Sequence, residues 1–382
     1  MKGSVSLYIH IPFCSSFCDY CDFYSEKIDP QENNYINSFI KALINDIREQ
    51  IKYFSVNEIE TVYIGGGTPS LLGKNISTLL DELKKLQLKN YNAFSPLEFT
   101  VEVNPESVTE EFLYTCKDKG VNRISLGVQT FHEPCRIAVN RKSDENMLME
   151  RLALVSKLFP GSFSADLITG LPFQKEKIVL EDINKILSFN PVHISLYALS
   201  VEDKTLLKEK IENREIEIPS EEEADSLWLA GCDALLKKGF NQYEISNFAI
   251  KEKICIHNMR YWQMQSWIGA GPAASGTIVN EDLGTAKRFT YREDVKEYLG
   301  SHSIETAISE DLDKQKLIRE SILMGFRCIK GADANVFKQR FGFSLQDCIP
   351  KTLERWEKMD KMLFLNQFLS DAFSELDSGE NS

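Results

Sequence analysis

The sequence lacks any apolar run that approaches the roughly 18 residues needed to span a bilayer. It is also short of positive charge, with 44 lysines and arginines against 57 aspartates and glutamates and a net charge of -13. This balance argues against general binding to nucleic acid, which usually requires a basic face. The apolar run near the N-terminus is short and is broken by His10 and Pro12, so we expect no export signal and a cytoplasmic location.

Disulfides are a second expected absence. The chain has nine cysteines, an odd number. In a reducing cytosol such thiols are metal ligands or small buried residues more often than disulfide partners. We expect burial for the five that lie scattered along predicted helices or loops, which are Cys116, Cys135, Cys232, Cys328 and Cys348.

Short β-rich runs alternate with helical stretches over the first 240 residues. The runs cover 6–11, 61–69, 97–105, 122–129, 164–172 and 192–200. The helical stretches cover 35–51, 75–87, 109–119, 144–158, 176–188 and 221–238. Strands separated by helices at this spacing predict parallel βα units. Six such units indicate an α/β fold, an incomplete (β/α)6 barrel over residues 1–240, with a doubly wound sheet as the structural alternative.

Polar or glycine residues interrupt the apolar pattern near the ends of five of these strands. They are Gly65–Thr68, Glu102 with Asn104, Gln129, Asp166 and Tyr197. Functional groups gather at the carboxyl ends of parallel strands, so we expect these residues to surround one opening, at that end of the barrel. A buried carboxylate is costly without a partner, which favours a binding role for Glu102 and Asp166.

Three cysteines follow the first strand closely in the segment YIHIPFCSSFCDYC. A structural zinc site usually has four ligands, and a disulfide has two. An iron–sulfur cluster held by only three thiolates leaves one iron without a protein ligand. A surface loop or an incomplete zinc site is the alternative interpretation of Cys14, Cys18 and Cys21.

The spacing Cys14-x3-Cys18-x2-Cys21, with Tyr20 before the last cysteine, resembles the motif of the radical S-adenosylmethionine (SAM) superfamily. In that superfamily the open iron is chelated by the amino and carboxylate groups of SAM. The resemblance therefore implies a [4Fe–4S] cluster and SAM as cofactors. The segment GGGTP at 65–69 is similar to the glycine-rich strand end that contacts SAM there, where glycines allow close backbone approach.

A narrower resemblance covers residues from about 5 to 300. The segments YIHIPFC, GGGTPS, VEVNPE, GVQTF and DLITGLP are similar to successive segments of the oxygen-independent coproporphyrinogen III oxidases and the related heme chaperone family HemW. The resemblance implies SAM or cluster contacts by Tyr8, Tyr20, Gly66, Gly67, Thr68 and Glu102, and contacts to a second SAM or a neighbouring substrate by Gln129, Arg141 and Asp166.

Two features favour resemblance to the chaperones over the oxidases. The oxidases carry another cysteine two residues after the third cluster cysteine, where this chain has Phe23. The segment CIHNMRYW at 255–262 resembles the HNxxYW signature of the chaperones, which implies a heme site formed by His257, Asn258, Tyr261 and Trp262. Imidazole is a common heme ligand, aromatic rings pack on the macrocycle, and Cys255 offers a thiolate as an alternative ligand. Without the resemblance, a packed loop histidine is the plainer interpretation.

The βα alternation ends after residue 240. We expect a barrel extension over 241–288, ending in the linker-like stretch VNEDLGTAKR at 279–288. Residues 289–382 read as a small, mainly helical domain that resembles the winged-helix-like C-terminal domain of the family. The chain after Trp356 leaves little room for the usual β wing, so we do not predict one.

Three functions follow as hypotheses. The first is a heme chaperone that binds a [4Fe–4S] cluster, SAM and heme and transfers heme to acceptor proteins. A homodimer and a transient contact with membrane-bound acceptors are compatible with it, and the sequence does not decide whether SAM is cleaved. The second is oxidative decarboxylation of coproporphyrinogen III, begun by a 5′-deoxyadenosyl radical. The third is a radical SAM enzyme that acts on another substrate.

Overall fold

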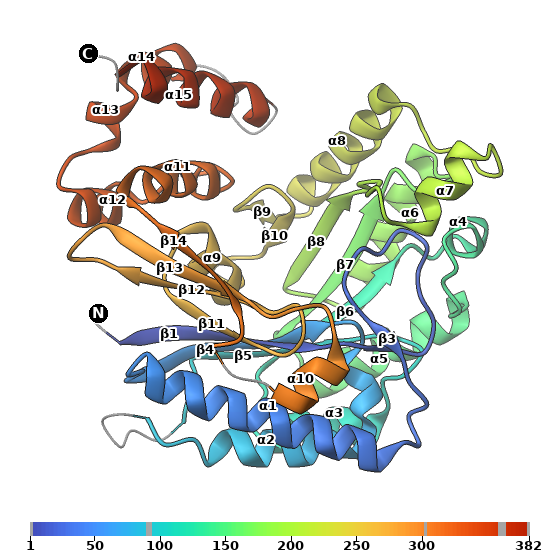
Figure 1. Cartoon of the computed structure of the whole chain (residues 1–382). Coiled ribbons are helices and arrows are strands. Elements are labelled where there is room, and N and C mark those ends of the chain that lie inside the picture. The colour runs from blue at the N-terminus through green and yellow to red at the C-terminus, as the bar shows by residue number, and fades with distance from the viewer. Residues whose placement is uncertain (1–2, 89–93, 302–303, 358–363, 380–382) are drawn as a thin grey trace.

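A computed structural model of the chain describes residues 3–88, 94–301, 304–357 and 364–379. Its main feature is one curved sheet of 12 strands (Figure 1). The centre of the sheet is a parallel run in chain order, formed by β1 (Ser4–Ile11), β4 (Glu58–Gly66), β5 (Glu98–Val103), β6 (Arg123–Gln129), β7 (Phe163–Thr169) and β8 (His193–Ala198).

Further strands extend both edges of this run. Beside β1 lie β11 (Trp267–Ala270), which is parallel to it, and the antiparallel strands β12 (Ser275–Asn280), β13 (Thr285–Thr290) and β14 (Ile308–Leu312). Beside β8 lie the antiparallel strands β10 (Asn247–Ala249) and β9 (Asn241–Gln242). Two short strands, β2 (Phe13–Cys14) and β3 (Glu26–Lys27), pair separately. In the described part of the chain the outermost strands, β14 and β9, do not pair, so the barrel is open.

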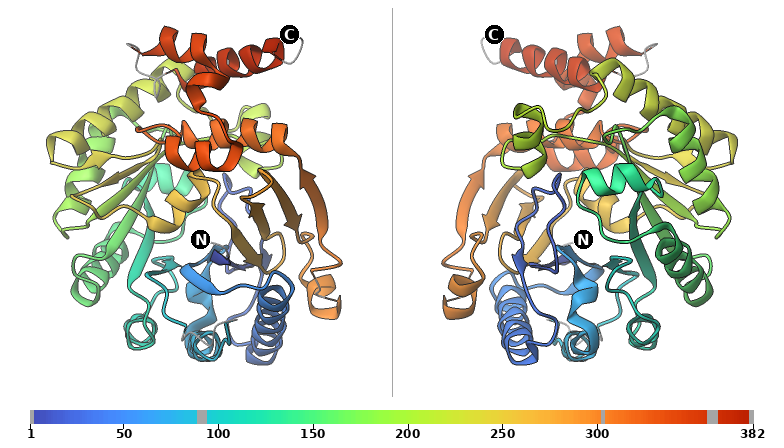
Figure 2. Two further views of the ribbon diagram at one scale, coloured as in Figure 1. Left: turned by 90° about the vertical axis from the view of Figure 1, so that its left-hand side faces the viewer. Right: turned by 90° about the vertical axis from the view of Figure 1, so that its right-hand side faces the viewer.

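A helix follows each parallel strand and covers the outer face of the sheet (Figures 1 and 2). These helices are α1 (Asn33–Tyr53), α2 (Ile76–Lys84), α3 (Glu110–Asp118), α5 (Glu145–Leu158), α6 (Glu176–Leu187) and α8 (Glu221–Lys237), with η1 (Pro69–Asn75), α4 (Glu133–Ala138) and α7 (Leu206–Glu212) in the loops. A doubly wound sheet would reverse its strand order and carry helices on both faces. The sequential order instead confirms the predicted incomplete (β/α)6 barrel.

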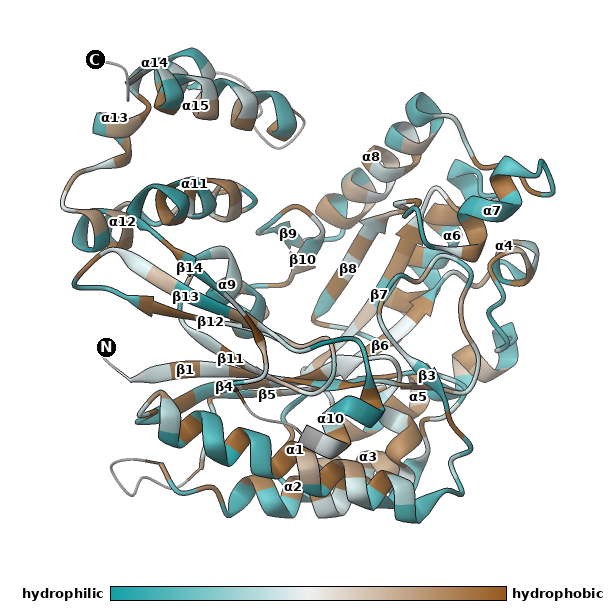
Figure 3. Ribbon diagram, viewed as in Figure 1, coloured by the Kyte–Doolittle hydropathy of each residue, from teal (hydrophilic) through white to brown (hydrophobic). Residues whose placement is uncertain are grey.

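Burial follows the pattern that was expected from the sequence. In α1 the apolar side chains of Ile36, Ile40, Leu43 and Ile47 recur every three or four residues and are buried. Figure 3 shows both hydrophobic and hydrophilic segments on these helices, as one buried and one exposed face require. Four of the scattered cysteines are buried, and Cys348 is half-buried. Within the described ranges, no helix combines the length and the apolar character needed to cross a membrane.

The predicted linker at 279–288 is wrong. Residues 275–290 form the hairpin of β12 and β13, and only the polar middle of the stretch is a turn. The Asn280 side-chain oxygen accepts hydrogen bonds from the backbone of Asp282 and Leu283, and Gly284 adopts a φ of 64°. On either side, Val279 and Ala286 are buried. The polar composition of a tight turn was thus mistaken for a linker.

The C-terminal part is helical and packs on β12–β14. It comprises α11 (Lys314–Gly325), α12 (Ala334–Phe341), α13 (Leu345–Cys348), α14 (Pro350–Trp356) and α15 (Leu365–Gly379), and its apolar side chains form a core of their own. Along the chain, α9 (Ile256–Trp262) lies between β10 and β11, and α10 (Val295–Ser301) lies between β13 and β14. After β14 the described residues form no strand, and their one β-type pairing is an isolated bridge between Cys328 and Glu244. Residues 358–363, in the region where we expect too little room for a wing, lie outside the described residues.

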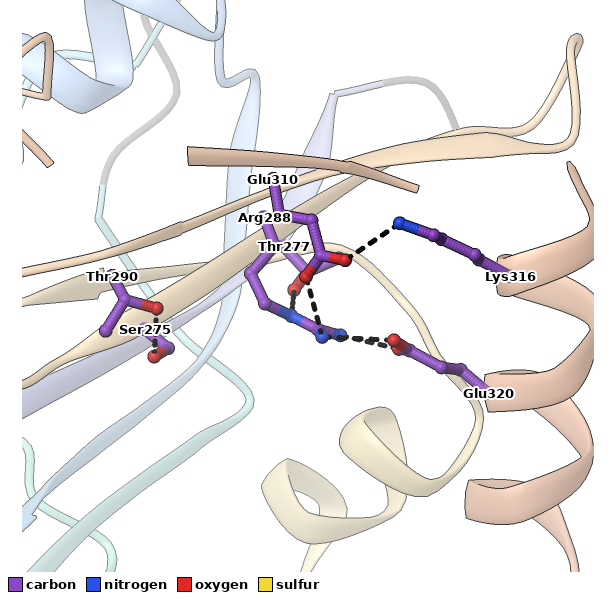
Figure 4. A network of polar contacts seen from close by, with 7 residues as sticks. All are labelled: Ser275, Thr277, Arg288, Thr290, Glu310, Lys316 and Glu320. Atoms are coloured by element: carbon purple, nitrogen blue, oxygen red, sulfur yellow. Dashed lines mark hydrogen bonds and ion pairs between the residues drawn. The ribbon is translucent and has the colours of Figure 1, made fainter. Parts of the chain in front are cut away.

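A polar network joins this helical part to the sheet (Figure 4). Arg288 of β13 pairs with Glu320 of α11 through two hydrogen bonds of 3.0 and 2.5 Å, and its Nε donates to Thr277 of β12 at 3.3 Å. Glu310 of β14 lies 3.9 Å from Arg288 and accepts from Lys316 at 3.2 Å. The predicted boundary between residues 288 and 289 therefore falls inside β13, and the purely helical part begins at α11.

Candidate cluster and cofactor site

The inner face of the parallel strands is polar along its whole width. The pairing register places on this one face Ser6, Tyr8 and His10 of β1, Thr61 and Tyr63 of β4, Glu98 and Glu102 of β5, Arg123 and Ser125 of β6, Ser164 and Asp166 of β7, and His193 and Ser195 of β8. The alternate residues are apolar and buried beneath the outer helices. The barrel therefore encloses a set of hydrogen-bonding and ionisable groups instead of a second apolar core.

The three predicted cluster cysteines lie in the loop that follows β1, at the carboxyl end of the strands. Cys14, Cys18 and Cys21 are each partly exposed. The Cys14 Sγ lies 3.6 Å from Thr68 Oγ1, and the Cys18 Sγ lies 3.4 Å from a guanidinium nitrogen of Arg141. Among the described residues no three Cys, His, Asp or Glu side chains converge on a single metal ion. A cluster does not require that convergence, since each thiolate binds a different iron atom.

The glycines at the end of β4 lie against this loop without room for side chains. A Cβ on Gly66, whose φ is 108°, would lie 2.7 Å from the His10 ring. A Cβ on Gly67 would lie 2.7 Å from the Phe13 carbonyl oxygen and 3.0 Å from the Cys14 Sγ. These contacts make the glycines a steric requirement for packing the cluster loop against the end of β4. The Gly67 N–H donates to the Ile11 carbonyl oxygen at 2.9 Å, and contact of these glycines with SAM stays a prediction.

Glu102 and Asp166 lie on the inner face near the same end of the barrel. Tyr63 donates a hydrogen bond of 2.7 Å to Glu102, and Ser125 donates to Asp166 at 3.2 Å. Burial, together with a smaller effect of the nearby Asp166 carboxylate, raises the pKa of Glu102 to about 7. Burial likewise raises the pKa of Asp166. The two carboxyl groups are poised to gain from a positively charged ligand group.

Gln129 is the last residue of β6, and Arg141 reaches the same end of the barrel from the loop between α4 and α5. Arg141 is 8% exposed and donates to the Gly127 carbonyl oxygen at 2.8 Å. Its Nε is buried and has no hydrogen-bond partner among the described residues. Gln129 has a φ of 69°, which is unusual for a residue other than glycine. An unpaired guanidinium N–H next to a cluster ligand fits an anionic group of a bound cofactor.

Tyr8 and Tyr20 take different positions. The Tyr8 hydroxyl lies 3.0 Å from His10 Nδ1, and its ring centre lies 6.4 Å from that of Tyr63, so it belongs to the inner face. Tyr20 packs against the small apolar cluster of Cys135, Val139, Ile168 and Leu171. Tyr8 is therefore placed to meet a ligand in the barrel, whereas the Tyr20 ring anchors the loop.

The predicted heme segment forms α9, and its histidine is fully buried. His257 is 0% exposed, and its Nδ1 and Nε2 lie 2.8 Å from Thr61 Oγ1 and 2.9 Å from Tyr261 Oη. Burial lowers the pKa of His257 to about 3, with the positive charges of Arg260 and Arg123 acting in the same direction. The imidazole is thus neutral, and both of its nitrogens are already hydrogen-bonded.

Of the other members of this segment, Tyr261 contacts His257, whereas Trp262 faces the C-terminal helices. Trp262 lies under Arg327, whose guanidinium carbon is 5.4 Å from the indole ring centre, on the side of the C-terminal helices. Tyr261 packs edge-on against His257 and Trp267. Asn258 is partly buried. The structure therefore does not bring the four residues together into one open pocket.

Glu98 is an interior residue that the sequence analysis did not single out. Its carboxylate is 6% exposed and accepts hydrogen bonds from the backbone N–H groups of Ile256 and His257, both at 2.9 Å. It thereby fixes the start of α9 inside the barrel. Glu98 and Glu102 are four positions apart on one strand, so strand alternation alone would have placed both on the same face.

The raised pKa of Glu102 predicts a pH dependence of stability. The folded protein holds this proton more tightly than an ordinary glutamate, whose pKa is 4.5, so the stabilising effect is complete below pH 4.5 and is lost as the pH rises through about 7. Cluster-free protein should lose on the order of 1–3 kcal/mol of unfolding free energy over this window. Denaturant unfolding of Glu102→Gln should show a flatter profile there. If stability depends on pH as steeply in Glu102→Gln as in the parent protein, a group other than Glu102 causes the pH dependence.

Comparison with known proteins agrees with these features. The model of the radical SAM superfamily matches residues 8–186. The heme chaperone HemW of Lactococcus lactis subsp. lactis (strain IL1403) is 33% identical over 347 residues, which cover 89% of this chain and 86% of that protein. The heme chaperone HemW of Bacillus subtilis (strain 168) is 32% identical over 363 residues, covering 91% and 90%.

A solved structure extends the comparison to the fold. Coproporphyrinogen III oxidase (HemN) from Escherichia coli, a radical SAM enzyme, superposes with a TM-score of 0.76 at 21% identity, over 94% of this chain and 84% of that one. At this identity the likeness shows the shared fold alone. The relatives above 30% identity, by contrast, extend over about nine-tenths of the sequence. The chain belongs to the heme chaperone HemW family of the radical SAM superfamily.

Proposed function

We propose that this protein binds heme and delivers it to acceptor proteins. The observation that carries the proposal is the match to heme chaperones along nearly the full chain, at 33% identity over 89% of its length. The acceptors would be proteins that use heme, including membrane-bound ones reached by transient contact, and the protein could act as a homodimer. The net charge of -13 argues against nucleic acid as a partner.

The proposal includes a resident [4Fe–4S] cluster and SAM, which membership of the radical SAM superfamily implies. Cys14, Cys18 and Cys21 would hold the cluster, which would supply one iron that lacks a protein ligand. The residues that would bind and orient SAM are Tyr8, Gly66, Gly67, Thr68 and Glu102, and those that would contact a second SAM or a neighbouring substrate are Gln129, Arg141 and Asp166. The Glu102 carboxylate suits the SAM ammonium, and the unpaired Arg141 Nε suits a carboxylate of the second ligand.

The sequence and the geometry give different indications of where heme would bind. The resemblance assigns it to His257, Asn258, Tyr261 and Trp262. Iron ligation by His257 requires that α9 move and that a hydrogen bond to Thr61 or Tyr261 break. Cys255 is a weaker candidate, because burial raises its thiol pKa to about 12 and keeps it protonated. In the present conformation α9 instead supports Tyr63, whose ring centre lies 5.2 Å from that of His257 and whose hydroxyl holds Glu102.

Coproporphyrinogen III oxidation is the second candidate, and Phe23 counts against it. The side chain is 64% exposed beside the cluster loop, at the position where the oxidases carry an additional cysteine. We expect that anaerobically reconstituted protein, given SAM, reductant and coproporphyrinogen III, forms no protoporphyrinogen. Turnover at rates common for enzymes, on the order of 1 per second or more, would overturn the chaperone proposal. Slow SAM cleavage to 5′-deoxyadenosine without porphyrin product would leave it standing.

A further inference from the structure

In the cluster loop, defined here as residues 14–21, Asp19 makes several contacts with other parts of the chain. Asp19 lies between Cys18 and Cys21, and its carboxylate is 2% exposed. Its backbone N–H donates to the Val139 carbonyl, just after α4, at 3.1 Å. Its carbonyl oxygen accepts from the Leu207 N–H in the first turn of α7 at 2.8 Å. The backbone N–H and the backbone carbonyl of Asp19 therefore both bind elements outside the loop.

The side chain of Asp19 pairs with a lysine that is remote in sequence. The Lys210 Nζ of α7 donates to the Asp19 Oδ2 at 2.6 Å, across a separation of 191 residues. The lysine is 29% exposed, whereas the carboxylate is buried. A buried carboxylate that loses the cation paired with it must either stay uncompensated or move into water. Movement of Asp19 would displace the backbone that carries Cys18 and Cys21.

A second contact fixes the loop on the side of α4. The Asn140 side-chain amide donates to the Phe17 carbonyl oxygen at 2.7 Å, directly before Cys18. The backbone on both sides of Cys18 is thus tied to segments 139–140 and 207–210. Ligand thiols held in place by hydrogen-bonded neighbours bind metal more tightly than mobile ones.

We propose that Lys210 is a positioning residue of the cluster. By pairing with the buried Asp19 carboxylate, it keeps the loop between Cys18 and Cys21 in the geometry that receives the cluster. Neither residue touches the cluster or SAM in this role. The inference concerns cluster retention and is independent of heme delivery, so failure of the chaperone proposal would leave it intact.

The test compares two lysines of the same helix. Lys210→Met keeps the length of the side chain and removes its charge. Lys208→Met is the matched control, because Lys208 pairs with the exposed carboxylates of Asp203 and Glu212, at 3.9 and 3.8 Å, instead of with a buried one. Lys210→Arg retains the charge and should behave like the parent protein.

Two measurements give the readout. In cluster-free protein, hydrogen–deuterium exchange across residues 14–21 should become roughly tenfold faster in Lys210→Met and stay unchanged in Lys208→Met. In reconstituted protein, an iron chelator should remove the cluster about 10–100 times faster from Lys210→Met than from the parent protein. This factor matches the usual effect on metal affinity of residues that hold the ligands in place. The double variant Asp19→Asn/Lys210→Met should lie between Lys210→Met and the parent, because no unpaired charge remains.

Equal exchange and equal cluster loss in Lys210→Met and Lys208→Met would overturn the proposal. If Lys210→Met does not fold, the comparison passes to the double variant and Lys210→Arg. Faster exchange of the cluster loop in the double variant than in Lys210→Arg then supports the positioning role. Equal exchange of the loop in these two variants contradicts it.

Discussion

Replacing Cys14, Cys18 or Cys21 singly by alanine should abolish the iron–sulfur cluster. Each thiolate is expected to hold a different iron, so two remaining ligands cannot retain a [4Fe–4S] cluster through anaerobic purification. The glycine at position 67, against which Cys14 packs, offers no side chain that could replace the lost sulfur. Iron and sulfide analysis together with the visible absorption of reconstituted protein should show near-complete loss in all three variants.

The control for the cysteine series is Cys348→Ala. Cys348 is half-buried like the three loop cysteines, but it lies in α13 of the helical part. This variant should retain the full iron and sulfide content and the spectral response to SAM. Retention of the parent content by any one of the three loop variants would show that the assigned ligand set is wrong.

Replacing His257 by alanine should cause a large loss of stability. The change removes the hydrogen bonds to Thr61 and Tyr261 and opens a cavity beside Tyr63. The Tyr261 hydroxyl loses its partner on His257, whereas the Thr61 hydroxyl keeps its hydrogen bond to Ser6. Losses of this kind usually total about 2–5 kcal/mol. Denaturant unfolding of the cluster-free protein measures the change. Thr61→Val, which leaves the imidazole in place, should show a smaller loss in the same direction.

The same variants separate a structural role of α9 from iron ligation. From the geometry we expect folded His257→Ala to keep the Soret position of heme-loaded protein, since the imidazole is buried with both nitrogens bonded. A shifted Soret band, or heme binding weakened in His257→Ala but intact in Thr61→Val, would instead establish His257 as the ligand that the sequence predicts. It would also show that α9 opens when heme binds.

The barrel was predictable because its signals are local. Each strand and each helix carries its own periodicity, and their alternation along the chain fixes a parallel arrangement. The same holds for the grouping of Gly66, Glu102 and Asp166, since strand ends of parallel βα units meet at one edge. The hairpin at 275–290 was missed because its turn has the composition of a linker and its buried positions, such as Val279, are few.

Long-range pairings were beyond the reach of sequence patterns. The contact of Asp19 with Lys210 joins residues that are 191 positions apart. Asp19 occupies a position of the cysteine motif at which no residue type is specified, and Lys210 belongs to no motif identified in the sequence. The burial of His257 depends on where α9 docks, which Glu98 of a distant strand determines. A family motif identifies a recurring histidine, but it does not indicate whether the imidazole faces a ligand or the protein interior.

Heme transfer tests the central claim most directly. Heme-loaded, cluster-containing protein is mixed with an excess of a heme-free acceptor of distinct Soret absorption, and the two are then separated and their spectra recorded. The account predicts a stoichiometric Soret band on the loaded protein and its movement to the acceptor faster than heme released from a nonspecific carrier such as albumin. Absence of saturable heme binding, or transfer no faster than from the nonspecific carrier, would contradict the account.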